Sequence, residues 1–493
     1  MKGESSMKTI MQYDSDFGNF SGCDPDELVH ALFYDTDMHG EYPDIILWES
    51  HSYLPQECET NNFDSYTYFW EQSIDMMQRL IDETHKRGML AYWHHRFCEV
   101  DFGPGNAFRK IPAENTIKKE HPDWLIKTWY EPGLWNLTVP ELQDFKVAFI
   151  KKYANKYNFD GMCIDFLRHL PCLPPGTQWE NRDAVTKFMG KVRSVIPAGM
   201  KLGAKVPENA AACHVDGFDV EKWVENGSVD FFVAGSRSIS SDVAWYKSIT
   251  AETGIEVYPC WDTWHSSDAC HWRDDDFYRG VFANWRAEKA DGIVGFNYLN
   301  TPAKVQIDLI GHSYSALYGQ NKPWITREFP DFLRQVRESA DDTLPRTYAA
   351  ERIGGYPYGT GAGGNNVFAP LPAEVHAEKP AEIPLRLYDQ RESATVHILI
   401  SGTHEADVFT VQINGISLPI ESCDTDHLDA LIHYPKPQPP SGAGYCYTQT
   451  PSPLLMLNVP VPDYAVHWGE NIFTVQCTQD GNIHIERLEV TFS

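Results

Sequence analysis

The sequence predicts a (β/α)₈ barrel followed by a smaller antiparallel β-sandwich. Two observations lead to this prediction: eight short apolar runs alternate with helical patterns or long loops before residue 300, and the pattern changes to strands without helices after about residue 340. Strands that alternate with helices form parallel sheets, and eight such units in about 300 residues close into a barrel. We therefore expect a barrel over residues 1–340 and a sandwich, with a Gly/Pro-rich lead-in, over residues 341–493.

The eight apolar runs are the predicted barrel strands. They span residues 9–13, 44–48, 89–93, 161–164, 201–206, 229–234, 255–260 and 292–298. Between them, apolar residues recur at three- and four-residue spacing, which is the period of an amphipathic helix. This spacing predicts helices over residues 68–86, which Gly88 terminates, and over residues 142–157.

The C-terminal part has a different pattern. A Gly-rich loop over residues 354–366 is followed by a Pro-rich stretch that runs to Pro384. Alternating apolar residues then predict strands over residues 395–400, 408–413, 454–459, 471–476 and 483–492. Asn414 and Gly415 predict a hairpin turn. The aromatic residues of this part are not gathered in one run, which favours a supporting role for the sandwich over carbohydrate binding.

Composition and charge exclude several classes of function. The chain has 493 residues and a net charge of −28, which disfavours nucleic acid and anionic membranes as partners. It has no stretch of 18 apolar residues that would span a membrane. The N-terminus lacks the apolar region of a signal peptide, so we expect a cytoplasmic protein unless a leader has been removed. The eleven scattered cysteines are expected to be reduced thiols, and a homo-oligomer stays open.

Residues 158–170, NFDGMCIDFLRHL, are the most informative stretch of the chain. An apolar strand ends there at Asp165, and Arg168 and His169 follow at once. In a barrel the carboxyl ends of all strands meet at one rim, which carries the chemistry. Polar residues follow the other strands too, so we expect one site that they share. The further rim residues are Asp14, Asp16, Glu49, His51, His94, His95, Arg96, Lys205, Glu208, Arg237, Asp262, His265 and Asn297.

Aromatic residues accompany these polar ones at or near the strand ends. They are Trp48, Trp93, Trp261 and Trp264. Flat aromatic faces beside acids suit a sugar ring, which has apolar C–H faces and a polar hydroxyl edge. Cleavage of a glycosidic bond needs two carboxyl groups, one protonated and one ionised. The predicted rim provides enough carboxyl groups for this reaction.

Two carboxyl groups on neighbouring strands form the predicted catalytic pair. Asp165 is the expected ionised member and nucleophile, because Arg168 and Lys205 would favour its charged form. Glu208 is the expected acid/base. Since strand side chains alternate, an inward Lys205 leaves Glu208 inward only if the bend at Pro207 shifts the phase.

Two further carboxyl groups stay candidates. Glu49 ends the second predicted strand and is the alternative to Glu208 as acid/base. Asp262 ends the seventh and is expected to contact a sugar hydroxyl or the transition state. Capping of the following loop is the competing explanation for Asp262.

Neighbouring histidines and the first strand end argue against a metal. His94 and His95 are adjacent, so they cannot both face the barrel axis; one is expected to bind sugar hydroxyls and the other to pack outside. Metal-dependent amidohydrolase barrels carry His-x-His at the end of their first strand, whereas this chain has Asp14-Ser15-Asp16 there. We therefore expect no metal and no cofactor. Two rival hypotheses stay open: a metal-dependent hydrolase that uses the rim histidines, and a non-catalytic carbohydrate-binding barrel.

Three segments resemble a known family. Residues 159–171, 217–236 and 292–300 are similar to a glycosyl-hydrolase-like TIM-barrel family that is often labelled family 10-like. The resemblance covers residues 7 to about 335, and the trailing sandwich fits the layout of that family. It implies sugar chemistry but no particular linkage. Chitinase-type barrels would have their acid at Leu167, so their mechanism does not carry over. The arrangement of Asp165, Glu208 and Asp262 on strands four, five and seven is similar to alpha-amylase-type barrels, but this likeness is topological only, because those barrels have an arginine where this chain has Met162-Cys163.

We therefore predict a glycoside hydrolase that acts on an oligosaccharide or on the end of a polysaccharide. Retention of anomeric configuration is the expected outcome. Carboxyl groups about 5–5.5 Å apart would give retention, and a separation of about 6.5–9.5 Å would give inversion. The identity of the sugar, exo or endo action, and a lyase or isomerase reaction on the same fold stay open at this stage.

Overall fold

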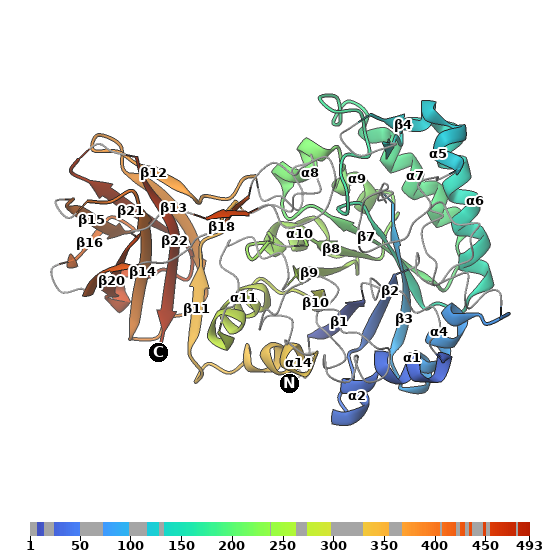
Figure 1. Ribbon diagram of the computed structural model, residues 1–493, viewed down its shortest axis with the longest axis horizontal. Coiled ribbons are helices and arrows are strands. Elements are labelled where there is room, and N and C mark those ends of the chain that lie inside the picture. Colours follow the sequence, from blue (N-terminus) through green and yellow to red (C-terminus); the bar gives the residue numbers. More distant parts are fainter. Residues whose placement is uncertain are drawn as a thin grey trace.

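A closed barrel of eight parallel strands forms the N-terminal part of the chain (Figure 1). The strands follow one another around the barrel in the order β1-β10-β9-β8-β7-β6-β3-β2. The computed structural model describes residues 7–13, 24–49, 72–97, 116–127, 133–236, 238–262, 274–296, 329–353, 367–404, 407–420, 424–428, 433–435, 447–449, 454–479 and 482–493. The predicted fold class is confirmed.

All eight predicted strands are present within a few residues of their expected bounds. They are β1 (Lys8–Tyr13), β2 (Ile45–Glu49), β3 (Leu90–Arg96), β6 (Gly161–Asp165), β7 (Lys201–Val206), β8 (Phe231–Ala234), β9 (Glu256–Asp262) and β10 (Gly292–Phe296). A two-stranded sheet, β4 (Leu125–Ile126) with β5 (Leu134–Trp135), lies between β3 and β6 in the chain.

Helices surround the barrel. Those described are α1 (Pro25–Leu32), α2 (Tyr34–His39), α4 (Met76–Lys86), α5 (Thr116–Glu120), α6 (Pro140–Lys156), α7 (Arg182–Val195), α8 (Ala210–Asp216), α9 (Val220–Glu225), α10 (Val243–Ile249), α11 (Asp275–Ala287) and α14 (Phe329–Glu338). None of these combines the length and the apolar content needed to cross a membrane. The helix predicted over residues 142–157 is confirmed as α6.

The helix predicted over residues 68–86 begins later than expected. Residues 68–71 lie outside the described residues, and α4 starts at Met76. Asp75 accounts for this start, because its side chain accepts a hydrogen bond from Gln78 N at 3.2 Å and so caps the first turn. The apolar spacing continues on the N-terminal side of Asp75, which is why the predicted helix began too early.

Strand alternation divides the barrel side chains between two cores. One set fills the lumen below the rim: Ile10, Ile45, Leu47, Tyr92, Cys163, Phe231, Val233, Tyr258, Cys260, Val294 and Phe296. The side chains between them point outward and join the helices in a second, larger core. The lumen is therefore packed with apolar groups except at the carboxyl ends of the strands.

The C-terminal part consists mainly of two antiparallel sheets. One has the order β11-β22-β14-β20-β17, with β12 paired to β22, and the other has the order β13-β21-β15-β16. Their strands are β11 (Arg346–Ala349), β12 (Ala373–Val375), β13 (Ala381–Leu387), β14 (Ala394–Ser401), β15 (Phe409–Ile413), β16 (Ile416–Leu418), β17 (Asp424–Leu428), β20 (Leu454–Val461), β21 (Gly469–Cys477) and β22 (Ile483–Phe492); β18 (His433–Pro435) and β19 (Tyr447–Gln449) pair separately. Apolar side chains from both larger sheets share one core, which makes a sandwich.

Two details of this part concern turn chemistry and proline. Asn414 and Gly415 both have positive φ, of 52° and 80°, and connect β15 to β16, so the predicted hairpin is confirmed. The Pro-rich stretch is not only a lead-in, because β13 contains Pro384. A proline is tolerated there because, among the described strands, β13 is at the edge of its sheet and pairs with β21 alone.

Helix α11 packs closely against the sandwich (Figure 1). Gly280 permits this contact, since a Cβ at that position would lie 2.1 Å from Thr347 O of β11. Asn284 Nδ2 donates a hydrogen bond to Arg386 O at 2.9 Å, and Arg279 Nε donates one to Pro345 O at 2.8 Å. The predicted domain boundary at residue 340 stays a prediction.

Candidate functional site

A layer of charged and polar side chains closes the lumen at the carboxyl ends of the strands. Each member points inward and is almost completely buried. The layer consists of Gln12, Glu49, His94, Arg96, Asp165 and Lys205. Burying charges is costly unless they are paired, so several ionisable groups at one level of an otherwise apolar lumen indicate a functional site.

Asp165 is fixed and ionised at the end of β6. Its Oδ1 accepts hydrogen bonds from Leu167 N at 2.8 Å and from Arg168 N at 3.1 Å. Its Oδ2 lies 3.2 Å from His94 Nε2 and 4.0 Å from Lys205 Nζ. Burial alone would raise the pKa of Asp165, but these cations outweigh burial and hold the pKa well below its ordinary value.

His94 connects Asp165 to a second buried carboxylate. Its Nδ1 lies 2.7 Å from Glu49 Oε2, which also lies 2.9 Å from Arg96 Nε. Burial opposes a charge on His94, yet the carboxylates of Glu49 and Asp165 raise its pKa above the ordinary value. The two carboxylates therefore favour the protonated form of the ring, which has Nδ1 toward Glu49 and Nε2 toward Asp165.

Lys205 completes the layer from the next strand. Its Nζ donates a hydrogen bond to Gln12 Oε1 at 2.9 Å and lies 4.8 Å from the centre of the Phe296 ring. Gln12 was not among the predicted site residues. Alternation could have identified it, because Gln12 lies two positions before the predicted Asp14 and therefore on the same face of its strand.

Glu208 is buried at the loop that follows β7. Burial raises the pKa of Cys213 on α8 and of Tyr246 on α10, and Glu208 lies close enough to influence both groups. Its main-chain oxygen accepts a hydrogen bond from Asp242 N at 2.8 Å. Strand β7, which ends two residues before Glu208, pairs with β6 so that Lys205 lies opposite Asp165. Its predicted role as acid/base stays a prediction.

The structure contradicts the predicted sugar-binding role of three tryptophans. Trp48, Trp93 and Trp261 are fully buried in the core between strands and helices. Trp48 Nε1 donates to Thr84 Oγ1 of α4 at 3.0 Å. Trp93 stacks on Phe159, and Trp261 packs edge-on against Phe277 and Tyr278 of α11. Each lies at an outward position of its strand, so none faces the lumen.

His95 also points outward and is corrected as a substrate contact. Its ring packs against Trp93 and Phe149 at centroid distances of 5.3 and 5.8 Å. This agrees with the expectation that one of the two adjacent histidines packs outside.

Arg168 and His169 are buried in the turn after β6, where His169 has a positive φ of 85°. Their contact with a substrate stays a prediction.

Several predicted residues lie outside the described residues. They are Asp14, Asp16, His51, Arg237, Trp264, His265 and Asn297. The backbone of Asp262 ends β9, but its side chain is not described. Among the described side chains, no group of three or more His, Cys, Asp or Glu residues is arranged to hold a metal ion.

Comparison with known proteins finds glycosyl hydrolases among distant relatives. No family model matches the chain. The chain is similar to glycosyl hydrolase DigH of Escherichia coli, with 24% identity over 237 residues that cover 37% of this chain and 53% of that protein. It is also similar to the 1,4-alpha-glucan branching enzyme GlgB of Butyrivibrio fibrisolvens, with 29% identity over 127 residues, or 22% of this chain and 19% of that one. The chain thus spans about half the length of DigH and about a fifth of the length of GlgB.

Solved structures overlap with this fold to a limited extent. The glycoside hydrolase domain of PgaB (BpsB) from Bordetella bronchiseptica gives a TM-score of 0.39 at 12% identity, over 61% of this chain and 96% of that one. The alpha-amylase from Geobacillus thermoleovorans gives a TM-score of 0.38 at 12% identity, over 95% of this chain and 98% of that one. The barrel assignment depends on the strand order of this chain itself.

Proposed function

We propose that the chain is a glycoside hydrolase that cleaves an oligosaccharide or the end of a polysaccharide. The observation that carries the proposal is the buried carboxylate of Asp165, which is ionised at the carboxyl end of β6 and faces two cations. The position is the one at which barrel enzymes carry their chemistry. The similarity to a glycosyl hydrolase over part of the chain supports the same reaction class.

Asp165 would act as the nucleophile of a retaining reaction. Its Oδ2 attacks the anomeric carbon while the bond to the leaving oxygen breaks, and Glu208 donates a proton to that oxygen. Glu208 then removes a proton from water, the water attacks the anomeric carbon, and the ester to Asp165 breaks. Oδ1 of Asp165 is held by two backbone N–H groups, so we assign the attack to Oδ2, which faces the side chains of His94 and Lys205 instead.

Glu49 has a different proposed task. Its Oε2 already contacts both Arg96 Nε and His94 Nδ1, so this oxygen is engaged with basic groups of its own layer. We therefore assign Glu49 as a positioning residue that holds His94 against Asp165. His94 and Lys205 would stabilise the negative charge that returns to Asp165 when the ester is hydrolysed.

Hydrolysis of aryl glycosides and natural oligosaccharides, with and without EDTA, tests the proposal. Wild type is compared with Asp165→Asn, Glu208→Gln and Asp144→Asn, the last being a control at a carboxylate that is 72% exposed in its ion pair with Lys191. Cleavage that resists EDTA and falls by about 10²–10⁴-fold in the first two variants, but not in the control, would support the paired-carboxylate mechanism. Loss with EDTA in the wild type would favour the metal-dependent hydrolase.

Azide separates the nucleophile from other roles of Asp165. In Asp165→Ala, a small anion can occupy the space of the carboxylate and attack the anomeric carbon from the same face. Recovered cleavage with formation of a glycosyl azide of inverted configuration would identify Asp165 as the nucleophile. If wild type cleaves no glycoside but still binds sugars, the non-catalytic barrel is correct and the proposed function fails.

A further inference from the structure

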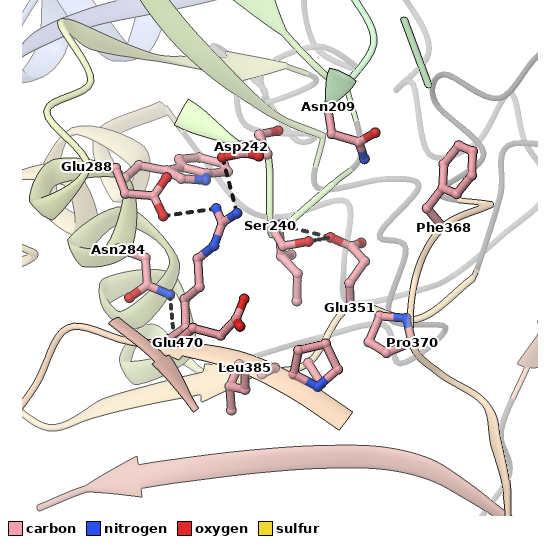
Figure 2. A pocket seen from close by; sticks show the side chains of 17 residues that line it. Asn209, Ser240, Asp242, Asn284, Glu288, Glu351, Phe368, Pro370, Leu385 and Glu470 are labelled. Atoms are coloured by element: carbon pink, nitrogen blue, oxygen red, sulfur yellow. Dashed lines mark hydrogen bonds and ion pairs between the residues drawn. The ribbon is translucent and has the colours of Figure 1, made fainter. Parts of the chain in front are cut away.

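A pocket of about 250 Å³ lies where the sandwich meets the barrel (Figure 2). Its barrel side comes from Asn209, from the loop after β8 and from the C-terminal end of α11. Its sandwich side comes from the end of β11 and the two residues that follow it, from Phe368 and Pro370, and from β13 and β21. In Figure 2, Phe368 stands on the side of the pocket away from Glu288. This pocket is distinct from the charged layer in the lumen, because the two share no residue.

The pocket borders the loops that carry the proposed acid/base. Asn209, which lines it, directly follows Glu208 and caps α8 through a hydrogen bond to Ala212 N. Asp242, which also lines it, donates its backbone N–H to Glu208 O at 2.8 Å. The loops that follow β7 and β8 therefore form both the pocket wall and the surroundings of Glu208.

The polar groups of the pocket form a largely acidic surface. Arg386 pairs with Glu288 at 3.0 Å and with Asp242 at 3.1 Å, and all three line the pocket. Glu351 accepts hydrogen bonds from the hydroxyl and the backbone N–H of Ser240 at 2.7 and 2.8 Å, and exposed Glu470 adds a further carboxylate. With four carboxylates to one arginine, the surface disfavours an anionic ligand and offers acceptors to hydroxyl groups.

Exposed aromatic side chains flank this polar surface. Phe368 is 50% exposed in the pocket lining, and Trp468 is 60% exposed beside it. Trp468 packs edge-on against Tyr388 with ring centroids 5.5 Å apart, and Tyr388 donates its hydroxyl hydrogen to Glu288 Oε1 at 3.3 Å. Arg386 lies opposite Glu470 in the pairing of β13 with β21. Tyr388 and Trp468 are each two residues further along their chain segments, so they lie on the same face as that pair.

We infer that this pocket and its flanking aromatics, Phe368 and Trp468, bind a segment of an uncharged glycan chain. Exposed aromatic faces beside hydrogen-bonding groups are the combination that recognises sugar rings, which have apolar C–H faces and a hydroxyl edge. The site would hold the part of the chain that extends beyond the barrel rim. The inference deepens the proposed function, and it rests on that function for the class of ligand.

Binding of uncharged oligosaccharides tests the site independently of turnover. Isothermal titration at low temperature would use maltohexaose, xylohexaose and cellohexaose, with a sulfated heparin hexasaccharide as the anionic probe. The variants are Trp468→Ala and Phe368→Ala, which change exposed side chains and should not disturb folding. Tyr464→Ala is the matched control, because Tyr464 is also an exposed aromatic of the sandwich but, unlike Phe368, does not line the pocket and, unlike Trp468, does not adjoin strand β21, which borders the pocket. Chromatography of the same mixtures reports hydrolysis separately.

We expect at least one uncharged hexasaccharide to bind, with the affinity falling about ten-fold in each of the two pocket variants and staying unchanged in the control. Equal affinity in all four proteins would overturn the site, whatever hydrolysis shows. Tighter binding of the heparin hexasaccharide than of every uncharged probe would overturn the ligand class. Binding that depends on Trp468 without any hydrolysis would support this site while the proposed function fails.

Discussion

His94 Nδ1 lies 2.7 Å from Glu49 Oε2 inside the closed end of the barrel lumen, and both side chains are completely buried. The other ring nitrogen of His94 faces Asp165. Burial opposes a charge on His94, but the two carboxylates raise its pKa above the ordinary value. His94 thus links two carboxylates that have different proposed roles.

The raised pKa of His94 predicts a pH-dependent contribution to stability. Because the pKa in the folded state lies above its ordinary value of 6.5, the stabilisation is fully present below that value and is lost as the pH rises through the folded pKa. Thermal unfolding of wild type and His94→Gln between about pH 4 and pH 9 measures it. The difference in Tm should be largest at the acidic end and should shrink as the pH rises. A difference that grows with pH would contradict the assignment.

Asp165 sets the acidic limit of that experiment. Its folded pKa lies below its ordinary value of 3.8, so its contribution is present above that value and is lost as the pH falls through the folded pKa. Between about pH 4 and pH 6.5 both contributions are present. The comparison of wild type with His94→Gln in this window therefore reports on His94 while the charge of Asp165 stays constant.

Removal of the Lys205 charge should move the acidic limb of the pH–rate profile. Among the cations that lower the pKa of Asp165 against its burial, Lys205 has the largest effect, so Lys205→Gln raises that pKa. A nucleophilic carboxylate must be ionised, and activity then falls at a higher pH than in the wild type. The profile of kcat/KM between about pH 3 and pH 7 measures the change.

Lys201→Gln is the control for that experiment. Lys201 begins the same strand, at the opposite end of the barrel, and its side chain is 55% exposed. Its profile should coincide with that of the wild type. If both lysine variants shifted the limb equally, a general change in net charge would explain the effect and the assigned influence of Lys205 on Asp165 would be wrong.

Trp48 should matter for stability and not for sugar recognition. Trp48→Phe removes the hydrogen bond to Thr84 and part of the packing against Tyr13 and Phe33. The loss should lower the free energy of unfolding by about 1–3 kcal/mol, measured by urea denaturation. The kcat/KM value should stay within about two-fold of the wild type, since the ring lies on the helix side of β2. A large fall in kcat/KM at unchanged stability would restore the predicted substrate contact.

The sequence was sufficient to predict the barrel because its signals are local. Runs such as residues 161–164 are apolar over their whole length, and the rim follows from where each run ends. The short strand β12 (Ala373–Val375) was not predicted, because three residues carry no measurable alternation. The start of α4 was missed because the cap at Asp75 interrupts a pattern that apolar spacing alone continues.

The site was predicted less completely than the fold, because the sequence does not show which of two neighbouring strand residues faces the lumen. Alternation excluded one of His94 and His95 from the lumen but could not say which, since the phase of β3 depends on its packing against α4 and α6. The same alternation places Trp48 outside when Glu49 faces inward, although proximity to the rim suggested both as sugar contacts. Polar side chains at strand ends were better guides than aromatic ones, because an aromatic ring suits the helix interface equally well.

The contact between Gly280 and Thr347 predicts the last outcome. A Cβ on Gly280 would lie 2.1 Å from the backbone oxygen of Thr347, which cannot rotate away, so Gly280→Ala must displace β11 from α11. We expect a fall of about 1–3 kcal/mol in the free energy of unfolding, although alanine favours helix over glycine. Gly190→Ala in α7 is the matched control, because nothing lies within 4 Å of its added Cβ, and it should stabilise by about 0.5–1 kcal/mol. Equal stabilisation by both substitutions, measured by urea denaturation, would show that α11 and β11 do not pack this closely in solution.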